Sequence, residues 1–313
     1  MDSFTTNSDG KRYLTQNNYL RSRFGGKVIK LSLNAGMSCP NRDGTKGTGG
    51  CIYCSPMLSG DFSGNSRLSV TEQLRSQTEL LSEKWQSSMY IPYFQAGSNT
   101  YAPLDVLKPL YEEALAFGGT VGLTIATRAD CISHDMLDYL KELSQRTYLT
   151  VELGLQTVHD TTAKYINRCH TYREFLHTYE LLKSSGINIC VHIINGLPGE
   201  TIQMMTDTAG QVSLLKPHSV KIHMLHLIKN TPLAEIYEKT PFYLLGREEY
   251  INIVCDQIEL MPPDTIIERI TGDGDRRTLI APLWTSDKKS VINGIDKELR
   301  RRNSRQGINF KSS

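Results

Sequence analysis

The sequence has no apolar run close to the roughly 20 residues that a membrane-spanning helix needs, so we expect no membrane partner. Its first residues, Met1 to Asn7, lack the charged-then-apolar order of a secretory signal peptide. The seven cysteines are odd in number and three of them are clustered, which fits a reducing compartment with a metal site better than a disulfide framework. We therefore expect a cytoplasmic globular protein.

The length is sufficient for a sizeable core, and the charge is unevenly placed. The 313 residues, 39% of them hydrophobic, can form one large α/β domain or two smaller ones. Residues 1–30 hold six basic and two acidic residues, residues 288–313 hold eight and two, and the net charge is +2, so the body carries −8. Basic ends on an acidic body indicate an anionic partner at the periphery, or only two solvated tails.

Three cysteines lie in one glycine-rich stretch, at Cys39, Cys51 and Cys54, with four glycines between the first two. Glycine lets a loop fold back tightly, and thiolates bind zinc or iron–sulfur clusters. A structural zinc site takes four ligands, whereas a 4Fe–4S cluster on three cysteines keeps one iron open for a substrate or cofactor. No fourth Cys or His lies nearby. From this stretch alone, iron–sulfur, zinc and unliganded cysteines all remain open.

Short apolar runs alternate with helical patterns along the chain. We expect strands at 28–33, 89–94, 121–125, 148–153, 189–194 and 220–225. Helices follow them, with Ser69 or Thr71 and then Ser133 as expected N-caps. Pro92 is unfavourable within a central strand because proline cannot donate to a sheet ladder.

Repeated βαβ units of this kind predict a parallel sheet. Closure into eight units would need more chain, so the predicted fold is α/β, a partial (β/α)6 barrel of TIM type. We expect a basic N-terminal segment at 1–27, the (β/α)6 core at 28–230 and a C-terminal extension at 231–313. The extension is predicted to hold helices over 231–260, a short strand near 266–270 and a basic tail.

Polar and glycine-rich sequences follow five successive strands, where such folds place their chemistry. They are the cysteine stretch and residues 95–100, 127–130, 152–156 and 195–200. This placement predicts one composite site.

These motifs resemble a known family. Six of them occur in the order found in radical S-adenosylmethionine (SAM) enzymes: the cysteine stretch, Gln95-Ala-Gly-Ser-Asn, Thr127-Arg-Ala-Asp, Glu152-Leu-Gly-Leu-Gln, Asn167-Arg-Cys-His and Gly196-Leu-Pro-Gly-Glu. The chain is most similar to the bacterial group related to the Elongator catalytic subunit and more remotely to oxygen-independent coproporphyrinogen oxidase. The Cys-x11-Cys-x2-Cys spacing is typical of that subgroup, whereas the usual superfamily spacing is Cys-x3-Cys-x2-Cys.

The resemblance implies that Cys39, Cys51 and Cys54 hold a 4Fe–4S cluster whose fourth iron binds the amino and carboxylate groups of SAM. Reductive cleavage of SAM would then give a 5′-deoxyadenosyl radical that abstracts hydrogen from the substrate. An electron donor such as flavodoxin or ferredoxin is implied as well.

The resemblance also implies contacts to SAM. Ala96, Gly97 and Ser98 match the segment that meets the methionine amino group, without its usual acidic residue. Arg168 matches an arginine at the methionine carboxylate, which a guanidinium fork suits; otherwise it is a surface arginine at a helix end. Cys169 stands where the relatives have glycine.

Four further residues complete the implied SAM site. Gln156 matches a polar residue facing the ribose or carboxylate, and otherwise satisfies buried backbone groups. Asn195 and Leu197 match the turn that contacts adenine in the family, although such a turn is also common in other proteins. Glu152 contacts SAM or forms a structural ion pair.

The function that the resemblance implies is tRNA modification by a radical SAM enzyme, at the 5-substituent of the wobble uridine and in the maturation of aminomethyl-type side chains. One alternative is radical chemistry on a small molecule such as a porphyrinogen. Another is a zinc-stabilised RNA-binding protein without catalysis. His192, His223 and His226, on predicted strands, are candidates for proton handling.

The basic C-terminal segment predicts an RNA contact. Apolar residues in 288–302 have helical spacing, so a helix can dock there and display its basic residues outward. Phosphate binding by such a face depends steeply on salt. The residues predicted to bind RNA are Arg300, Arg301, Arg302 and Arg305.

Overall fold

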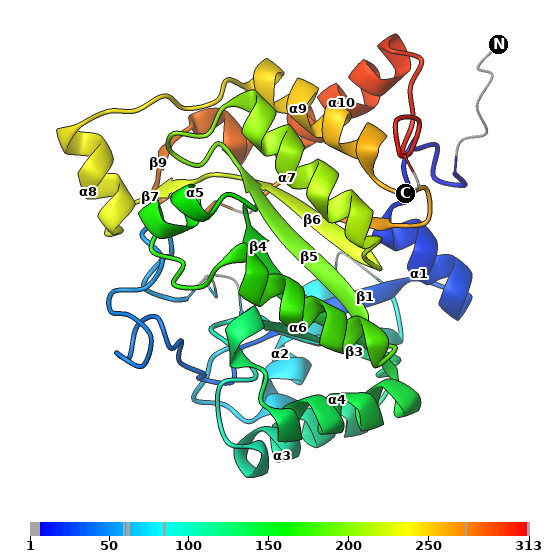
Figure 1. Cartoon of the computed structure of the whole chain (residues 1–313). Helices are drawn as coiled ribbons and strands as arrows, with labels where there is room; N and C mark the ends of the chain where they lie inside the picture. The colour runs from blue at the N-terminus through cyan, green and yellow to red at the C-terminus, as the bar shows by residue number, and fades with distance from the viewer. Residues whose placement is uncertain (1–6, 59, 61–62, 84–85, 273, 312–313) are drawn as a thin grey trace. The chain divides into compact units, whose positions relative to one another are not determined.

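The computed structural model describes residues 7–58, 60, 63–83, 86–272 and 274–311 (Figure 1). Seven parallel strands form one sheet in the order β1-β2-β3-β4-β5-β6-β8. Their bounds are β1 Val28–Leu33, β2 Met89–Phe94, β3 Gly122–Thr127, β4 Tyr148–Gln156, β5 Asn188–Asn195, β6 Ser219–Met224 and β8 Ile266–Arg269. All six predicted core strands are present, and the predicted α/β fold of partial-barrel type is confirmed.

The seventh strand, β8, is the short strand expected in the extension, and it belongs to the main sheet. It pairs with β6, with Ser219 opposite Ile266 and Val220 opposite Ile267. Two helices, α8 (Pro232–Lys239) and α9 (Arg247–Leu260), separate these strands in sequence. A local pattern cannot show which sheet such a distant strand joins. The predicted boundaries after residues 27 and 230 remain predictions.

The chain divides into two compact units. Unit 1 comprises Met1–Tyr19, Leu155–Asn167 and Val191–Ser313, and unit 2 comprises Leu20–Gly154 and Arg168–Cys190.

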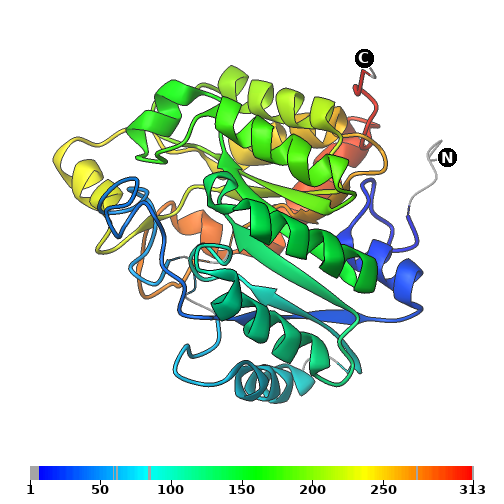
Figure 2. The same cartoon turned by 60° about the horizontal axis from the view of Figure 1, so that its bottom comes forward.

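Unit 2 carries β1 to β3, most of β4, and helices whose caps are readable in the sequence. The helices are α2 Val70–Ser82, α3 Leu104–Ala116, α4 His134–Arg146 and α6 Tyr172–Ser184, besides the short 3₁₀ turn η1 Ala129–Cys131. Ser69 and Ser133 cap α2 and α4 as expected, each accepting a bond from a first-turn backbone N–H. Figures 1 and 2 show α3, α4 and α6 along the same side of these strands.

Pro92 is accommodated because β2 pairs unevenly with its two neighbours. On the β1 side Pro92 stands opposite Leu31. On the β3 side the ladder begins only at Tyr93, opposite Thr124, after a separate bridge at Tyr90. The missing N–H of proline is therefore not required by the ladder with β3.

Unit 1 packs two helices, one on each side, against α9, so that three helices form a group. These are α7 (Ile202–Leu215), α9 and α10 (Lys288–Arg301), which lie side by side in Figure 1. The predicted apolar stripe of α10 is buried at Val291, Ile295 and Leu299. A small antiparallel pair, β7 (Leu227–Ile228) and β9 (Leu279–Ala281), precedes the turn η2 Leu283–Ser286.

The beginning of the described chain is tied to its end within unit 1. The Leu14 backbone N–H donates to Gln306 Oε1 at 2.8 Å, and Thr15 bridges Ile267 of β8. Arg12 is buried and donates to the Ser304 carbonyl at 3.1 Å, and Lys11 pairs with Asp296. These two basic residues are therefore structural and do not belong to a solvated tail.

Two helices were not expected from the sequence. They are α1 (Gln16–Phe24) and α5 (Asp160–Tyr165). Only Leu20 is buried on α1, and α5 has only six residues. Neither presents the repeated apolar spacing that predicts a helix.

Candidate functional site

The eleven residues between Cys39 and Cys51 fold into a compact hairpin after β1. The Lys46 and Gly47 backbone N–H groups donate to the Pro40 carbonyl at 2.8 and 3.2 Å. The Gly50 N–H donates to the Asn41 carbonyl at 2.7 Å, beside both cysteines. Gly44, Gly49 and Gly50 have positive φ, a conformation that glycine adopts at low cost. The long spacer therefore returns the chain to its start and brings Cys51 back toward Cys39.

Arg42 ties the hairpin to the residues that follow it in the chain. Its guanidinium donates to three carbonyls beyond the hairpin, those of Cys54 at 3.2 Å, Ser55 at 2.6 Å and Pro56 at 3.0 Å. A Cβ on Gly50 would lie 2.8 Å from Arg42 Nε, so the side chain lies across the glycine. The Cys54 N–H donates to the Cys51 carbonyl at 2.9 Å, which completes the turn that carries the last two thiols.

The three thiols influence one another electrostatically. Burial, with the neighbouring Cys54 and Cys39, raises the pKa of the Cys51 thiol to about 11, against the lowering effect of Arg128 and of a hydrogen bond with Tyr53. Asn41, which is fully buried, directs its Nδ2 at the Cys51 sulfur at 3.7 Å. Binding of a metal would have to displace the thiol protons, since only thiolates are good ligands.

This donor set fits an iron–sulfur cluster. Three thiols from one loop lie close enough to couple, each partly exposed. Among the described residues, no group of three His, Cys, Asp or Glu side chains is placed to hold a single metal ion. A 4Fe–4S cluster does not require such a group, because its three thiolates bind three different irons.

The segment after β2 packs directly on the cysteine loop. Gly97 and Ser98 donate from their backbone N–H groups to the Leu58 and Ser38 carbonyls, at 3.2 and 3.0 Å. Gly97 has φ +75°, and a Cβ there would lie 2.2 Å from the Met37 carbonyl oxygen. Ala96 and Ser98 on either side are buried. The structure therefore brings the predicted residues Ala96, Gly97 and Ser98 against the residues that precede Cys39.

A buried ionic group lies after β3. Asp130 accepts two bonds from Arg128, at 2.9 Å from Nε and 2.9 Å from Nη2, and pairs with Lys46 of the cysteine loop at 3.2 Å. His170 Nδ1 lies 3.2 Å from Arg128 Nη2 and 3.9 Å from Asp130. Burial, with the charges of Arg168 and Arg128, lowers the pKa of His170 to about 3, so its imidazole is neutral at physiological pH.

Arg168 is the largest fully buried side chain of the described chain, which rules out a surface position. Its Nε donates to the His170 carbonyl at 3.0 Å, and its own carbonyl accepts a bond from Arg128 at 2.9 Å. Its positive charge acts on Tyr53, between the last two cysteines, where burial keeps the pKa of the phenol well above its usual value. Arg168 is therefore held beside the cysteine loop, and its contact with the methionine carboxylate remains a prediction.

The remaining predicted SAM contacts have different local roles. In unit 2, Glu152 is buried on β4 opposite Ala126. In unit 1, Gln156 ends β4 with φ +63°, and Leu197 is buried in the turn after β5. The side-chain amides of Asn195 and Gln257 of α9 form two hydrogen bonds, each 2.8 Å long, so Asn195 holds β5 to that helix.

Unit 1 contains three partly buried histidines near the ends of its strands. The rings of His192 on β5 and His223 on β6 are 4.3 Å apart. Burial, then the charges of His192, Arg269 and Lys221, hold the pKa of His223 well below its usual value, and burial with Lys288 lowers that of His226 to about 4. These two rings are neutral at physiological pH, so they are suited to hydrogen bonding more than to acid catalysis.

The basic C-terminal residues divide into two sets. Arg300, Arg301 and Arg305 are exposed, and Arg301 pairs with Glu298 of its own helix at 2.7 Å. Arg302 instead turns toward α9 and pairs with Asp256 at 2.5 Å, Glu259 at 3.3 Å and Glu298 at 2.7 Å. The expectation that Arg302 is displayed outward is wrong, because three carboxylates inside unit 1 bind it.

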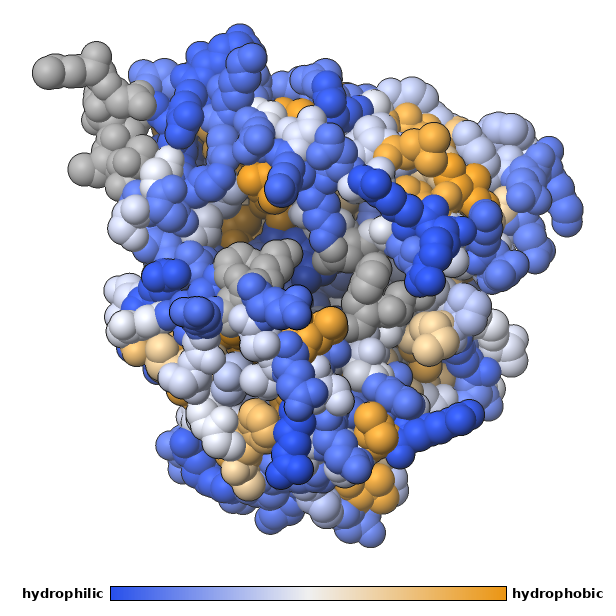
Figure 3. Space-filling model, turned by 180° about the vertical axis from the view of Figure 1, so that it is seen from behind, coloured by the Kyte–Doolittle hydropathy of each residue, from blue (hydrophilic) through white to orange (hydrophobic). Residues whose placement is uncertain are grey.

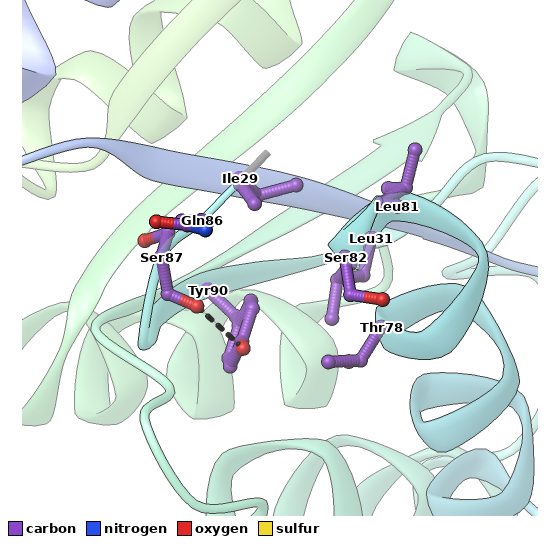
Figure 4. A pocket seen from close by; sticks show the side chains of 8 residues that line it. All are labelled: Ile29, Leu31, Thr78, Leu81, Ser82, Gln86, Ser87 and Tyr90. Atoms are coloured by element: carbon purple, nitrogen blue, oxygen red, sulfur yellow. Dashed lines mark hydrogen bonds between the residues drawn. The ribbon is translucent and has the colours of Figure 1, made fainter. Parts of the chain in front are cut away.

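Unit 2 also contains a cavity of about 250 Å³ that the cysteine loop does not line (Figure 4). It lies near the starts of β1 and β2, at the strand ends opposite the cysteine loop, and its lining residues are Ile29, Leu31, Thr78, Leu81, Ser82, Gln86, Ser87 and Tyr90.

Figure 3 shows that apolar side chains on one face form separate groups among hydrophilic ones. In the part of the chain that is described, no helix combines the length and apolar character needed to cross a membrane.

Sequence reasoning assigned no role to Lys46, Asp130 or His170. All three belong to motifs that were recognised, but these motifs lie far apart in the sequence, so nothing in it shows that they meet. The signal available in the sequence was a charged pair, Arg128 and Asp130, directly after a strand.

Comparisons with known families and proteins agree with this geometry. Residues 43–212 match the Radical SAM superfamily, and residues 217–301 match the Radical_SAM C-terminal domain. YtqA of Bacillus subtilis (strain 168) is 47% identical over 307 residues, which covers 98% of this chain and 95% of YtqA.

Two further similarities are more distant. The tRNA uridine(34) acetyltransferase of Methanocaldococcus jannaschii is 29% identical over 156 residues, which covers 49% of this chain and 28% of that protein. The solved structure of Methanocaldococcus infernus Elp3 with residues 1–46 deleted has a TM-score of 0.68 at 19% identity, covering 89% of this chain and 64% of the other. At this identity the structural likeness shows the fold alone.

Proposed function

Because this chain belongs to the radical SAM superfamily, we propose that it binds a 4Fe–4S cluster on Cys39, Cys51 and Cys54 and modifies tRNA. The proposed target is the 5-substituent of the wobble uridine, in the maturation of aminomethyl-type side chains. When bound, the cluster and SAM supply a 5′-deoxyadenosyl radical that abstracts hydrogen from the substrate. The observation that carries the cluster assignment is the hairpin that returns Cys51 to Cys39.

The residues around the loop have distinct proposed roles toward the cofactors. The three thiolates would bind three irons, and Asn41 would direct its amide at the Cys51 sulfur, a contact of the kind that tunes a cluster. The Gly97 segment would meet the methionine amino group through its backbone. Arg168, held beside the loop with its charge buried, would bind the methionine carboxylate. These roles remain proposals.

In unit 1, the polar residues after β4 and β5 have proposed roles toward SAM. Gln156 would face the ribose or carboxylate of SAM. The turn with Asn195 and Leu197 would contact adenine through its backbone, because the Asn195 side chain is already bonded to Gln257. Glu152 of unit 2 keeps its two alternatives, a SAM contact or an ion pair.

The choice of tRNA rests on similarity and on charge. Half of the chain is similar to a protein named tRNA uridine(34) acetyltransferase, and the exposed arginines near the C-terminus suit phosphate. Only 28% of that relative is covered, so acetyl transfer is not part of the proposal. The reaction also needs an electron donor, for which a flavodoxin or ferredoxin is proposed.

Mass spectrometry of tRNA nucleosides tests this function. A strain without the gene should accumulate an unfinished wobble uridine, which the wild-type gene restores and a Cys51→Ala gene does not. Identical nucleosides in all three strains would contradict the tRNA assignment and favour a small-molecule substrate. Metal content of the purified protein separately tests the zinc-stabilised, non-catalytic alternative.

A further inference from the structure

One buried carboxylate in unit 2 serves three basic side chains. Asp130 has a side chain that is 3% exposed, and it contacts Arg128, Lys46 and His170 at 2.9, 3.2 and 3.9 Å. Burial opposes its ionisation, but the hydrogen bonds and the charge of Arg128, with the charge of Lys46, outweigh it, so the pKa of Asp130 lies below its usual value. The carboxylate is therefore an anion at physiological pH.

These partners come from separate segments. Arg128 and Asp130 follow β3, His170 precedes α6, and Lys46 lies in the hairpin between Cys39 and Cys51. The β3 end is itself fixed, since the Ala129 carbonyl accepts a bond from Thr178 of α6 at 2.8 Å. Only the hairpin lacks a strand or helix of its own.

Lys46 connects the carboxylate to the cysteines through short steps. Its backbone N–H bonds to the Pro40 carbonyl, next to Cys39. The following residue, Gly47, packs so closely that a Cβ would lie 2.4 Å from Asn41 Oδ1 and 2.9 Å from the Cys169 sulfur. Asn41 in turn contacts the Cys51 sulfur. A movement of Lys46 would therefore move the residues beside both cysteines.

We propose that Asp130 is a positioning residue for the cysteine loop, and that its pair with Lys46 latches the hairpin to the end of β3. The latch fixes the spacing of Cys39 and Cys51 before and after the cluster is inserted. A buried anion among three bases suits this role, because a partly buried ion pair is screened less than a surface pair. The role toward the cluster rests on the proposed 4Fe–4S site, whereas the latch itself belongs to the polypeptide.

The test compares Asp130→Asn and Lys46→Ala with a matched control. Glu112→Gln also removes one carboxylate that pairs with an arginine, Arg146 at 2.8 Å, but on the helices α3 and α4. Lys46 is partly exposed, with 37% of its side chain accessible, so its truncation leaves the Arg128–Asp130 pair in place. Asp130→Glu keeps the charge and serves as the rescue variant.

Two measurements report the rigidity of the cysteine loop independently of enzymatic activity. In the cluster-loaded protein, iron loss to a chelator should be about tenfold faster in Asp130→Asn, and the electron paramagnetic resonance spectrum of the reduced cluster should broaden. In the cluster-free protein, trypsin should cleave after Arg42 about tenfold faster. Arg42 reports the whole loop, because its own bonds go to Cys54, Ser55 and Pro56. Lys46→Ala should change both readouts in the same direction, and Asp130→Glu should restore them in part.

Wild-type values for Asp130→Asn and Lys46→Ala in both measurements would overturn the latch, and so would equal changes in Glu112→Gln. If Asp130→Asn fails to fold by circular dichroism, Lys46→Ala decides. If the wild type binds no cluster, the proposed function fails, while cleavage after Arg42 still tests the latch. Neither measurement depends on tRNA modification in cells, so failure of the latch can be distinguished from failure of the proposed function.

Discussion

At the scale of single residues, the three clustered cysteines differ from the scattered ones. Replacing Cys39, Cys51 or Cys54 with Ala should remove the cluster and all SAM cleavage, because each supplies one of three thiolates. The fold should survive, since the seven strands do not depend on the loop. Iron analysis and circular dichroism check this together. Cys190→Ala is the control: this cysteine is fully buried in β5, so the variant should lose some stability and keep its iron.

Gly97 is a second residue with a specific requirement. Gly97→Ala should destabilise the protein by more than about 2 kcal/mol, because a side chain at φ +75° is strained and would overlap the Met37 carbonyl. Iron retention should fall as well, since Met37 precedes the cysteine loop. Urea unfolding measures the loss. Gly210→Ala on α7, where a Cβ meets open space, should be neutral or stabilising by up to about 1 kcal/mol; equal effects at both positions would contradict the prediction.

The lowered pKa of the partly buried His226 predicts that the stability of the protein depends on pH. Burial and Lys288 lower its pKa from 6.5 to about 4, so the unfolded chain takes up a proton below pH 6.5 that the folded protein does not accept until about pH 4. This contribution is full above pH 6.5 and is lost as the pH falls to 4. Between about pH 7.5 and pH 5 it removes about 2 kcal/mol, which His226→Gln should spare. Urea unfolding of the cluster-free wild type and His226→Gln at both pH values measures this difference. An equal loss of stability in the two proteins would contradict the role of His226.

At the scale of elements, the arginines at the end of helix α10 fall into two sets, an exposed set expected to bind RNA and Arg302, which is expected to stabilise the fold. Changing Arg300, Arg301 and Arg305 together to Ala should weaken tRNA binding and reduce the salt slope by roughly 2–3, because fewer counterions are released. Folding stability should change little, since exposed pairs such as Arg301–Glu298 contribute at most about 1 kcal/mol.

Arg302→Ala provides the matched comparison on the same helix. It should cost about 1–3 kcal/mol of stability, because Asp256 and Glu259 lose their basic partner, and it should leave the salt slope unchanged. Filter binding at two salt concentrations and urea unfolding give both quantities. Equal tRNA affinity for the triple variant and the wild type would remove this face from RNA recognition.

At the scale of the whole molecule, the cofactor proposal predicts a coloured, redox-active protein. Anaerobic reconstitution with iron and sulfide should give a brown protein that, with a strong reductant, releases 5′-deoxyadenosine from SAM. The Cys51→Ala protein should be colourless and inactive under the same conditions. A colourless wild type that retains zinc through purification would instead support the non-catalytic alternative.

Much of this molecule was determined by local sequence. The six core strands follow from short apolar runs between turns, because a strand's apolar pattern is written in its own residues. The caps Ser69 and Ser133 and the buried stripe of α10 are local in the same way. The cysteine loop was readable because thiols and glycines at a fixed spacing carry their chemistry wherever the loop lies.

Tertiary structure alone decided which distant residues meet. It placed β8 in the main sheet, turned Arg302 toward Asp256, and tied Lys11 to Asp296. It also joined Lys46 to Asp130, which no spacing in the sequence indicates. A charged side chain carries no mark of its partner, because an ion pair depends on where two separate loops end in space. The sequence determined the chemistry available, and folding determined which charges hold that chemistry in place.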